Sequence, residues 1–343
     1  MSGGAPTAAL WRSEPMYLTF YGLKEKPFNA TPDPKFLYLT PGHREALAQL
    51  VYSVQENRGF LVLTGEVGTG KTTLLHAFLQ RLNRVNGQTA VAYVFNTMLP
   101  FEDLLEYVLE ELGVPTPPSS PAQRLLALRR FMLDRRRAGQ NTVLILDEAQ
   151  NLDPATLERI RMLSNLETPT EKLLQILLVG QPELRAKLNR PELRQLQQRI
   201  ELQCGLAPLS REQVRDYIET RLRVAGARDL GLFSDRAQDR IAAYSRGIPR
   251  RVNILCDHCL VIGYAEHRRR IEVDTVDQAI AALAGAAQRP ARRPASLARA
   301  TWERWFLGAV AAALIAGIAV SPLRTEATQL LTFARHVRDL FLR

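Results

Sequence analysis

A glycine-rich loop between an apolar run and a helix constrains this chain more than any other feature of its sequence. Residues 65–72 read GEVGTGKT and match the pattern G-x-x-x-x-G-K-[ST] at every fixed position. The run FLVLT at residues 60–64 is typical of a buried parallel strand, and a helix is expected from Lys71. A strand, a glycine loop and a helix in this order predict a phosphate-binding loop.

Each part of this loop has a chemical task. Glycines allow positive φ and let backbone N–H groups approach phosphate oxygens, and the start of the helix adds free N–H groups. Lys71 supplies a mobile cation for the β- and γ-phosphates, and the hydroxyl of Thr72 is placed for Mg²⁺. The residues predicted to bind the nucleotide are Gly65, Glu66, Val67, Gly68, Thr69, Gly70, Lys71, Thr72 and Thr73.

A second apolar strand ends in two carboxylates. The run TVLIL at residues 142–146 is followed directly by Asp147 and Glu148. We expect Asp147 to bind the Mg²⁺ shell and Glu148 to polarise an attacking water as a general base. Plain cap or loop roles for two acids are the alternative, but downstream of a phosphate loop the pair predicts hydrolysis of Mg-ATP.

Strand and helix signals alternate up to residue 209. Strands are expected at residues 60–64, 90–95, 142–146 and 173–179. Amphipathic helices between them predict a doubly wound α/β layer with a parallel sheet. The strand signal then stops, and helices are expected at residues 210–225, 234–245, 249–266 and 274–283. We predict an α/β nucleotide-binding domain at 16–209 and a helical domain at 210–284, after a disordered leader at 1–15.

The net charge of +10 is concentrated near the C-terminus. Residues 285–343 hold nine arginines and three acids, whereas the other residues are nearly balanced. A basic Pro/Arg linker at 285–304 precedes 19 uncharged residues at 305–323, a length that can cross a bilayer core. We predict one transmembrane helix there and a short amphipathic tail at 324–343. The charge that flanks this run favours an anionic membrane surface over nucleic acid.

The three cysteines, Cys204, Cys256 and Cys259, are too few for a disulfide framework. Cys256 and Cys259 form a C-x-x-C pattern, which could bind zinc. A second such pair is missing from the sequence, and the position within a predicted helix favours packed small residues. Arginine triplets at 135–137 and 268–270 are expected at helix ends, where they neutralise carbonyl groups; a nucleic-acid patch is the alternative.

Segments spread along the chain resemble a known family. They are FYGLKEKPF at 20–28, PDPKFLYL at 32–39, TGEVGTGKTT at 64–73, LILDEAQNL at 144–152, LLVGQPEL at 177–184, LQQRI at 196–200 and GIPRRVNILCD at 247–257. In this combination, residues 16–283 resemble the ATPase of the general secretion pathway protein A (ExeA-like) family, within the AAA+ class. The resemblance implies a P-loop NTPase (AAA+) fold, a three-layer αβα arrangement with a C-terminal helical lid, and ATP and Mg²⁺ as cofactors.

The resemblance also assigns roles to single residues. Gln181 lies where the first sensor is expected. Arg199 matches an arginine finger that reaches the γ-phosphate of a neighbouring subunit, with Arg194 as its rival. Arg250 resembles the second sensor, a lid arginine that touches the nucleotide, and plain structural roles stay open for all of these residues. The residues expected to wall the adenine are Tyr21, Phe28 and Pro34.

The resemblance further implies a function at a membrane. The family couples ATP binding to oligomerisation and, with a partner such as general secretion pathway protein B, helps to assemble the outer-membrane secretin of type II secretion. We predict a homo-oligomeric ATPase anchored in the inner membrane by a single span, with the ATPase domain in the cytoplasm, that drives assembly of a secretion complex. Two alternatives stay open: a DNA-binding helper ATPase of transposition, and a nucleotide-dependent scaffold in pilus or exopolysaccharide assembly with little hydrolysis.

Overall fold

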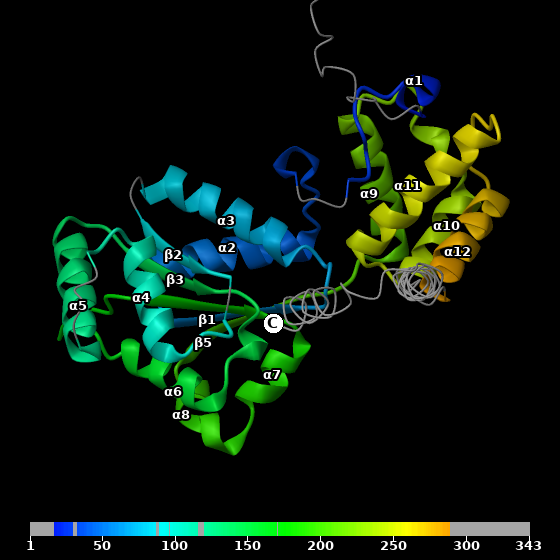
Figure 1. Ribbon diagram of the computed structural model, residues 1–343. Helices are drawn as coiled ribbons and strands as arrows, with labels where there is room; N and C mark the ends of the chain where they lie inside the picture. The colour runs from blue at the N-terminus through cyan, green and yellow to red at the C-terminus, as the bar shows by residue number, and fades with distance from the viewer. Residues whose placement is uncertain are drawn as a thin grey trace, which may run out of the picture. The chain divides into compact units, whose positions relative to one another are not determined.

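A five-stranded parallel sheet forms the centre of the α/β part of the protein (Figure 1). The computed structural model describes residues 17–29, 33–86, 89–95, 97–115, 120–169 and 171–288. The strands are β1 (Phe60–Gly65), β2 (Ala90–Val94), β3 (Thr142–Leu146), β4 (Gln175–Gly180) and β5 (Ile200–Leu206). Their spatial order is β2-β3-β4-β1-β5, and neighbouring strands are parallel. The loops that follow β1, β3 and β4 therefore meet at one edge of the sheet.

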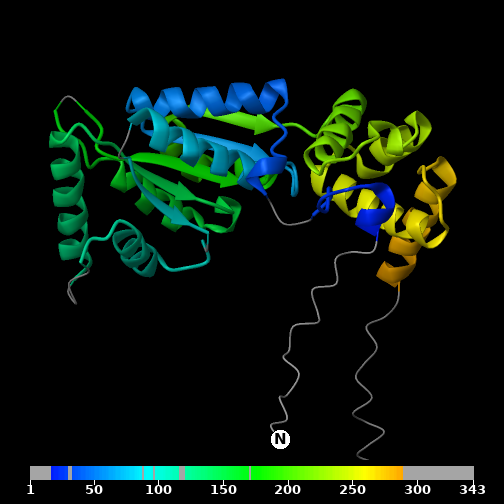
Figure 2. The same cartoon turned by 90° about the horizontal axis from the view of Figure 1, so that it is seen from above.

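Helices cover both faces of this sheet (Figure 2). One face carries α2 (Pro41–Gln55) and α3 (Lys71–Asn86). The other face carries α4 (Phe101–Glu111), α5 (Pro121–Arg137), α6 (Pro154–Leu163) and α7 (Pro182–Leu188). Along β1, Leu61 and Leu63 pack toward α2 and α3, while Phe60 and Val62 pack toward the opposite helices. A strand buried on both faces needs a continuous apolar run, which the sequence supplies at this place.

Short elements connect the α/β part. They are α8 (Arg194–Gln197), η1 (Pro34–Phe36), η2 (Ala149–Asn151) and η3 (Pro191–Leu193). The turn η2 directly follows the two acids at the end of β3, and α7 directly follows Gln181 at the end of β4. The chain therefore turns away from the sheet immediately after Glu148 and after Gln181.

The helical part consists of α9–α12 and confirms the helices expected after residue 209. They are α9 (Arg211–Val224), α10 (Asp235–Ser245), α11 (Pro249–Ala265) and α12 (Val273–Gln288), with the turn η4 (Leu230–Leu232). Ser210 and Gln213 form a capping box at the start of α9, and the side chain of Ser234 accepts from Ala237 N at the start of α10. Such caps satisfy N–H groups that the first turn of a helix leaves free.

The first described helix, α1 (Tyr17–Tyr21), packs on the helical part. The hydroxyl of Tyr17 donates to Asp257 Oδ1 at 2.6 Å, and that of Tyr21 donates to Arg268 O at 3.1 Å. These contacts join a segment that the sequence places in the α/β domain to α11 and the loop after it. The described residues up to Ala282 form one compact unit, so a domain boundary after residue 209 stays a prediction.

Strand β5 is absent from the strands expected from the sequence. Its apolar residues alternate with exposed ones, because Leu202, Cys204 and Leu206 pack toward α2 while Glu201 and Gln203 are exposed. This strand forms an edge of the sheet. It therefore shows the two-residue period of a half-exposed strand rather than the continuous apolar run of β1, β3 and β4.

Within the part of the chain that the structure describes, none of the helices combines the length and the apolar character needed to cross a bilayer. The predicted leader at 1–15, transmembrane helix at 305–323 and tail at 324–343 lie outside the described residues, as does most of the predicted linker at 285–304.

Candidate nucleotide-binding site

A cavity of about 580 Å³ opens where the glycine-rich loop meets the helical part. Its walls come from residues 67–74 of the loop and α3, from Asp33 and residues 36–39, and from residues of α9 and α11. Glu148, at the end of β3, completes the lining. The volume falls within the range of about 300–1,000 Å³ found for small-molecule sites.

The backbone of the glycine-rich loop has the conformation that the sequence predicts for phosphate binding. Gly68 and Gly70 have φ of +82° and +100°, values that side chains disfavour. A Cβ at Gly65 would lie 2.8 Å from Thr69 Oγ1, so this position also requires glycine. Helix α3 begins at Lys71, directly after the loop. Its free N–H groups and dipole therefore face the same cavity as the loop amides.

Lys71 lies in the cavity wall with only 7% of its surface exposed. Its Nζ donates to Gly65 O at 2.7 Å and to Glu66 O at 3.2 Å. Burial lowers the pKa of Lys71, although the charges of Glu148, Asp147 and other acids act in the opposite direction. A buried ammonium group held only by carbonyls is well placed to gain an anionic partner.

Asp147 is held by two hydrogen bonds at the end of β3. Tyr93 on β2 donates its hydroxyl to Asp147 Oδ2 at 2.7 Å, and Glu148 N donates to Oδ1 at 2.9 Å. Burial, followed by the bond to Asp147, raises the pKa of Tyr93, which therefore keeps its donating proton. A carboxylate at Asp147 and a hydroxyl at Thr72 are hard oxygen donors of the kind that Mg²⁺ prefers. The chemistry of these two side chains therefore fits the metal that the sequence implies; Thr72 lines the cavity, whereas Asp147 is not among its lining residues.

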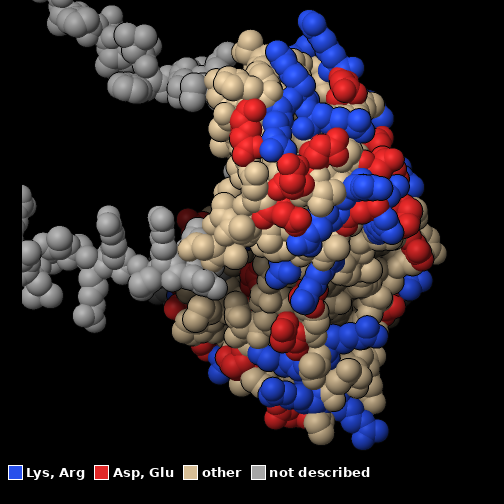
Figure 3. All heavy atoms as spheres, turned by 90° about the vertical axis from the view of Figure 1, so that its right-hand side faces the viewer, with Lys and Arg blue, Asp and Glu red and all other residues tan. Residues whose placement is uncertain are grey.

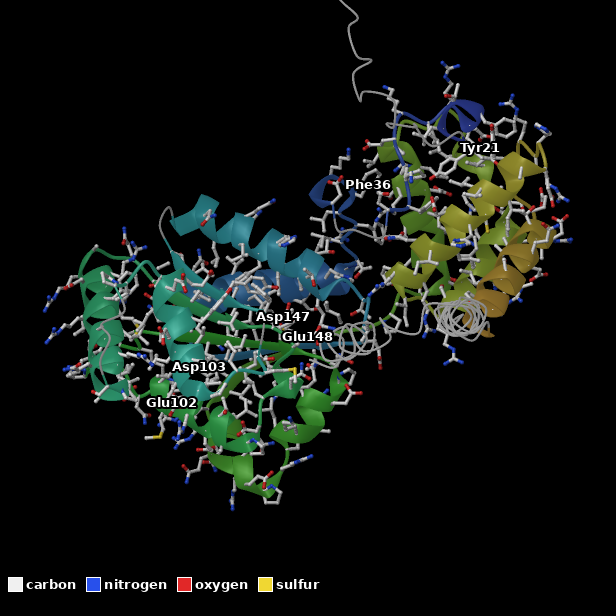
Figure 4. The ribbon with its side chains drawn as sticks, in the orientation of Figure 1. Tyr21, Phe36, Glu102, Asp103, Asp147 and Glu148 are labelled. Carbon is white, nitrogen blue, oxygen red and sulfur yellow. The ribbon has the colours of Figure 1, made fainter. Side chains whose placement is uncertain are left out.

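Glu148 has an unusual backbone and a fixed side chain. Its φ of 50° and ψ of 37° lie in the left-handed region, and its carbonyl accepts from Thr97 Oγ1 at 2.9 Å. Burial acts to raise the pKa of Glu148, but hydrogen bonds from two amide side chains and the charge of Lys71 outweigh it, so the pKa is lowered. Glu148 is therefore ionised at neutral pH. Figure 4 shows it beside Asp147 at the sheet edge.

Two glutamines hold the carboxylate of Glu148. Gln150 Nε2 and Gln181 Nε2 donate to Glu148 Oε2 at 2.5 Å and 3.2 Å. Gln150 Oε1 also accepts from Gln181 N at 3.0 Å, which links the ends of β3 and β4. The structure therefore places Gln181, at the end of β4, next to Glu148. β4 itself lies between β1 and β3.

Arg250 brings the helical part to the glycine-rich loop. It lies in the first turn of α11 and lines the cavity. Its N–H donates to Gly68 O at 3.4 Å, and a Cβ added at Gly68 would lie 2.8 Å from Arg250 Cβ. The predicted second sensor thus lines the same cavity as the glycine-rich loop of its own chain.

Arg199 and Arg194 do not join this cavity. Arg199 Nη1 donates to Ser164 Oγ at 3.2 Å, beside the start of β5, and Arg194 is exposed on α8. Ile200 pairs with Phe60 at the start of β1, whereas the glycine-rich loop follows the end of β1. Arg199 therefore lies at the opposite edge of the sheet from the phosphate loop of its own chain.

The structure corrects the prediction of which aromatic residues surround the adenine. Tyr21 packs on the helical part, as Figure 4 also shows, and Phe28 is 3% exposed and stacks edge-on against Phe233. Neither lines the cavity, and Pro34 begins η1. The aromatic side chains that do line it are Phe36, Tyr38 and Tyr217. The two wrong choices fill the core between segment 17–29 and the helical part, where large apolar rings are the usual packing residues.

The sequence prediction also misses three residues that hold the two acids. Tyr93 holds Asp147, Thr97 holds the backbone of Glu148, and Gln150 holds its carboxylate. Gln150 had a local signal, because it lies two residues after Glu148 in the same turn. Tyr93 and Thr97 had none, because their contacts depend on β2 lying beside β3.

The sheet order, the phosphate loop, the paired acids and the helical part together define a P-loop protein of the AAA+ class. A family profile described as AAA domain matches residues 54–188. Two solved structures share the fold at 18% identity. One is the ORC2 protein of Aeropyrum pernix in ADPNP–ADP complexes, with a TM-score of 0.54 over 73% of this chain and 71% of that chain. The other is Drosophila ORC bound to DNA, with a TM-score of 0.58 over 85% and 73%.

A curated relative identifies the family within this class. General secretion pathway protein A of Aeromonas hydrophila is 40% identical over 301 residues, which are 88% of this chain and 52% of that protein. The chain belongs to the general secretion pathway protein A (ExeA-like) family of AAA+ ATPases. It spans about half the length of the curated relative that it matches.

Proposed function

We propose that the chain binds Mg-ATP in the cavity and hydrolyses it. The observation that carries this proposal is the placement of an ionised carboxylate, Glu148, in the lining of the same cavity as Lys71. A phosphate loop alone accounts for nucleotide binding. A carboxylate fixed by two amides adds a base that can accept a proton from water.

The residues divide the work as follows. Lys71 and the loop amides hold the β- and γ-phosphates. Thr72 and Asp147 would hold Mg²⁺, which would neutralise charge on the phosphate oxygens. Glu148 accepts a proton from the attacking water, and Gln181 keeps the Glu148 carboxylate in place. Arg250 contributes positive charge from the helical part. The contacts of Lys71, Asp147, Glu148, Gln181 and Arg250 support these roles.

We place the base of ATP against Phe36, Tyr38 and Tyr217. These side chains line the cavity, and Arg221 packs its guanidinium over the rings of Phe36 and Tyr217, with centroid distances of 4.7 Å and 5.4 Å. Aromatic faces bind purines through stacking, which tolerates different bases. The proposal therefore assigns these aromatic residues, rather than Tyr21 and Phe28, to the wall around the adenine.

Steady-state phosphate release by the full chain tests hydrolysis. Glu148→Gln keeps the shape of the side chain but removes the base, so we expect Mg-ATP binding to persist and phosphate release to fall about 100-fold or more. Glu110→Gln, on the exposed face of α4, is the matched control and should behave like the wild type. Equal rates for the wild type and Glu148→Gln would remove Glu148 from the mechanism.

We further propose that the ATPase is anchored in the inner membrane by residues 305–323, with the nucleotide site in the cytoplasm. The family membership and the uncharged run in the sequence support this proposal. The test uses a reporter enzyme that is active only outside the cytoplasm, fused after residue 343. We expect this fusion to be active. A fusion that stays cytoplasmic would contradict this orientation.

The same membership supports a role in assembling a secretion complex as an oligomer, with a partner such as general secretion pathway protein B. Co-purification of the full chain with that protein from detergent-solubilised membranes, dependent on Mg-ATP, would support this role. If the two proteins still co-purify without nucleotide, and also when the chain carries Lys71→Met, ATP does not control the assembly.

Surface charge on one face of the molecule argues against non-specific binding to DNA there. On the face shown in Figure 3, Lys and Arg side chains alternate with Asp and Glu side chains rather than forming one broad basic patch. Proteins that bind DNA without reading its sequence rely on such patches. Retention of the full chain on DNA that weakens steeply with salt would revive the transposition-helper alternative.

A further inference from the structure

His43 lies behind the phosphate loop, in the first turn of α2. Its side chain is 6% exposed and lines the cavity. The ring makes two contacts: Nδ1 lies 2.6 Å from Thr40 Oγ1, and Nε2 lies 3.2 Å from Thr69 O in the loop. The residue thus connects the helix that supports the sheet to the backbone that we expect to hold phosphate.

The contacts determine which ring nitrogen carries the proton. Thr40 is the N-cap of α2, and its Oγ1 accepts from His43 N at 3.1 Å, so its own hydrogen is free to be donated to Nδ1. Thr69 O is a carbonyl and can only accept, so Nε2 must donate to it. A neutral ring protonated at Nε2 satisfies every one of these groups. Burial favours this neutral form, because it lowers the pKa of His43 more than the bond to Thr69 O raises it.

A bond to Thr69 O also orients the next amide. The peptide unit between Thr69 and Gly70 is planar and trans, so its C=O and N–H point in opposite directions. A carbonyl that points at His43 therefore directs the N–H of Gly70 away from α2. Gly70 itself lines the cavity, and with φ of +100° and no side chain it could rotate freely without such a restraint.

We infer that His43 is a positioning residue for nucleotide binding, which holds the Thr69–Gly70 peptide so that the Gly70 N–H faces the triphosphate. The inference rests on the proposed function. Thr40 supports His43 in turn, because its hydroxyl keeps the donating hydrogen on Nε2. The mechanism requires a donor at the Nε2 position and does not require an imidazole ring.

Three substitutions in the full chain separate these requirements. His43→Gln places an amide N–H near the Nε2 position, His43→Asn places one near Nδ1 only, and His43→Leu provides bulk without a donor. Affinities for Mg-ATP, for inorganic tripolyphosphate and for adenosine are measured by equilibrium binding. Thermal unfolding without nucleotide is the control for folding.

We expect His43→Gln to bind Mg-ATP and tripolyphosphate within about threefold of the wild type. His43→Asn and His43→Leu should bind both about tenfold or more weakly, since a misdirected amide forfeits a hydrogen bond to a charged group. Adenosine affinity should not change in any variant, because adenosine lacks the phosphates that the Gly70 amide contacts. If His43→Leu fails to fold, the comparison of the Gln and Asn variants decides the question.

Two results would overturn the inference. If the Gln and Asn variants bind Mg-ATP equally, or if tripolyphosphate and adenosine weaken together, His43 has only a structural role. In both cases the proposed ATPase stands, provided that Lys71→Met abolishes Mg-ATP binding by the otherwise unchanged chain. Absence of Lys71-dependent binding by the wild type would overturn the proposed function and this inference together.

Discussion

Glu148 is constrained through its backbone as well as through its side chain. A residue with a Cβ in the left-handed region costs about 1–2 kcal/mol, and such strain persists only where the surroundings hold it. Thr97 holds its carbonyl, while Gln150 and Gln181 hold its carboxylate. The carboxylate therefore has one defined direction, as a base acting on a positioned water requires.

Gln150 should tune the acidity of Glu148. The hydrogen bond from its side-chain amide stabilises the charged carboxylate, so Gln150→Leu should raise the pKa of Glu148. When the solution is acidified, Glu148 should then be protonated, and lost as a base, at a higher pH than in the wild type. We expect the acid limb of the pH profile of kcat for phosphate release to move toward neutrality, with kcat about tenfold lower. Gln123→Leu, exposed on α5, is the control. An unchanged acid limb would mean that Gln150 does not set this pKa.

Tyr93 should affect the metal rather than the base. Tyr93→Phe removes the hydroxyl that orients Asp147, and loss of such an outer-shell partner weakens metal binding about 10- to 100-fold. We expect a higher Mg²⁺ concentration for half-maximal phosphate release, with nearly unchanged kcat at saturating Mg²⁺. Tyr107→Phe on α4 provides a matched control, because Tyr107 packs against Phe95 instead. A lower kcat with unaltered Mg²⁺ dependence would contradict the assignment of Asp147.

At the scale of elements, the sequence predicted what lies close together along the chain. The phosphate loop and the two acids each occupy a few consecutive residues after an apolar strand, so spacing alone reveals them. Tyr93 and His43 act from β2 and α2, and no local pattern reports which element packs beside the loop. Edge strand β5 was missed because its pattern is half polar. Tyr21 and Phe28 were misassigned because the same aromatic residue types pack in cores and stack on bases.

The contact between the loop and α11 can be tested at Gly68. Gly68→Ala adds a Cβ that strains a φ of +82° and meets Arg250 Cβ at 2.8 Å. Gly113→Ala adds the same kind of strain, at φ of +69°, with nothing within 4 Å. In denaturant titrations Gly113→Ala should lose about 1 kcal/mol of unfolding free energy, and Gly68→Ala should lose more, because the contact with Arg250 adds to the strain. We expect only Gly68→Ala to weaken Mg-ATP binding, by about tenfold, and equal affinities would show that α11 does not shape the site.

At the scale of the whole molecule, one chain does not bring every residue assigned to hydrolysis to its own cavity. Arg199 lies at the start of β5, about 17 Å along the sheet from the phosphate loop, given five strand steps of about 3.3 Å. A finger at this edge can act only on a nucleotide held by another copy. The finger role proposed for Arg199 therefore requires the proposed oligomer.

Mixing two inactive variants tests this arrangement. Glu148→Gln lacks the base but keeps Arg199, and Arg199→Ala lacks the finger but keeps its own cavity. We expect each alone to release phosphate about 100-fold or more slowly than the wild type, and a mixture to recover part of the activity. Arg194→Ala, exposed on α8, should behave like the wild type. If the mixture stays inactive while Arg194→Ala is impaired, Arg194 is the finger.

Binding of Mg-ATP to the full chain, measured by calorimetry for the wild type, Lys71→Met and Lys172→Met, tests the central claim most directly. Lys71 lines the cavity, whereas Lys172 pairs with Glu201 at the far edge of the sheet. The account predicts saturable binding by the wild type and Lys172→Met and none by Lys71→Met. Equal binding by all three proteins, or binding by none of them, would contradict it.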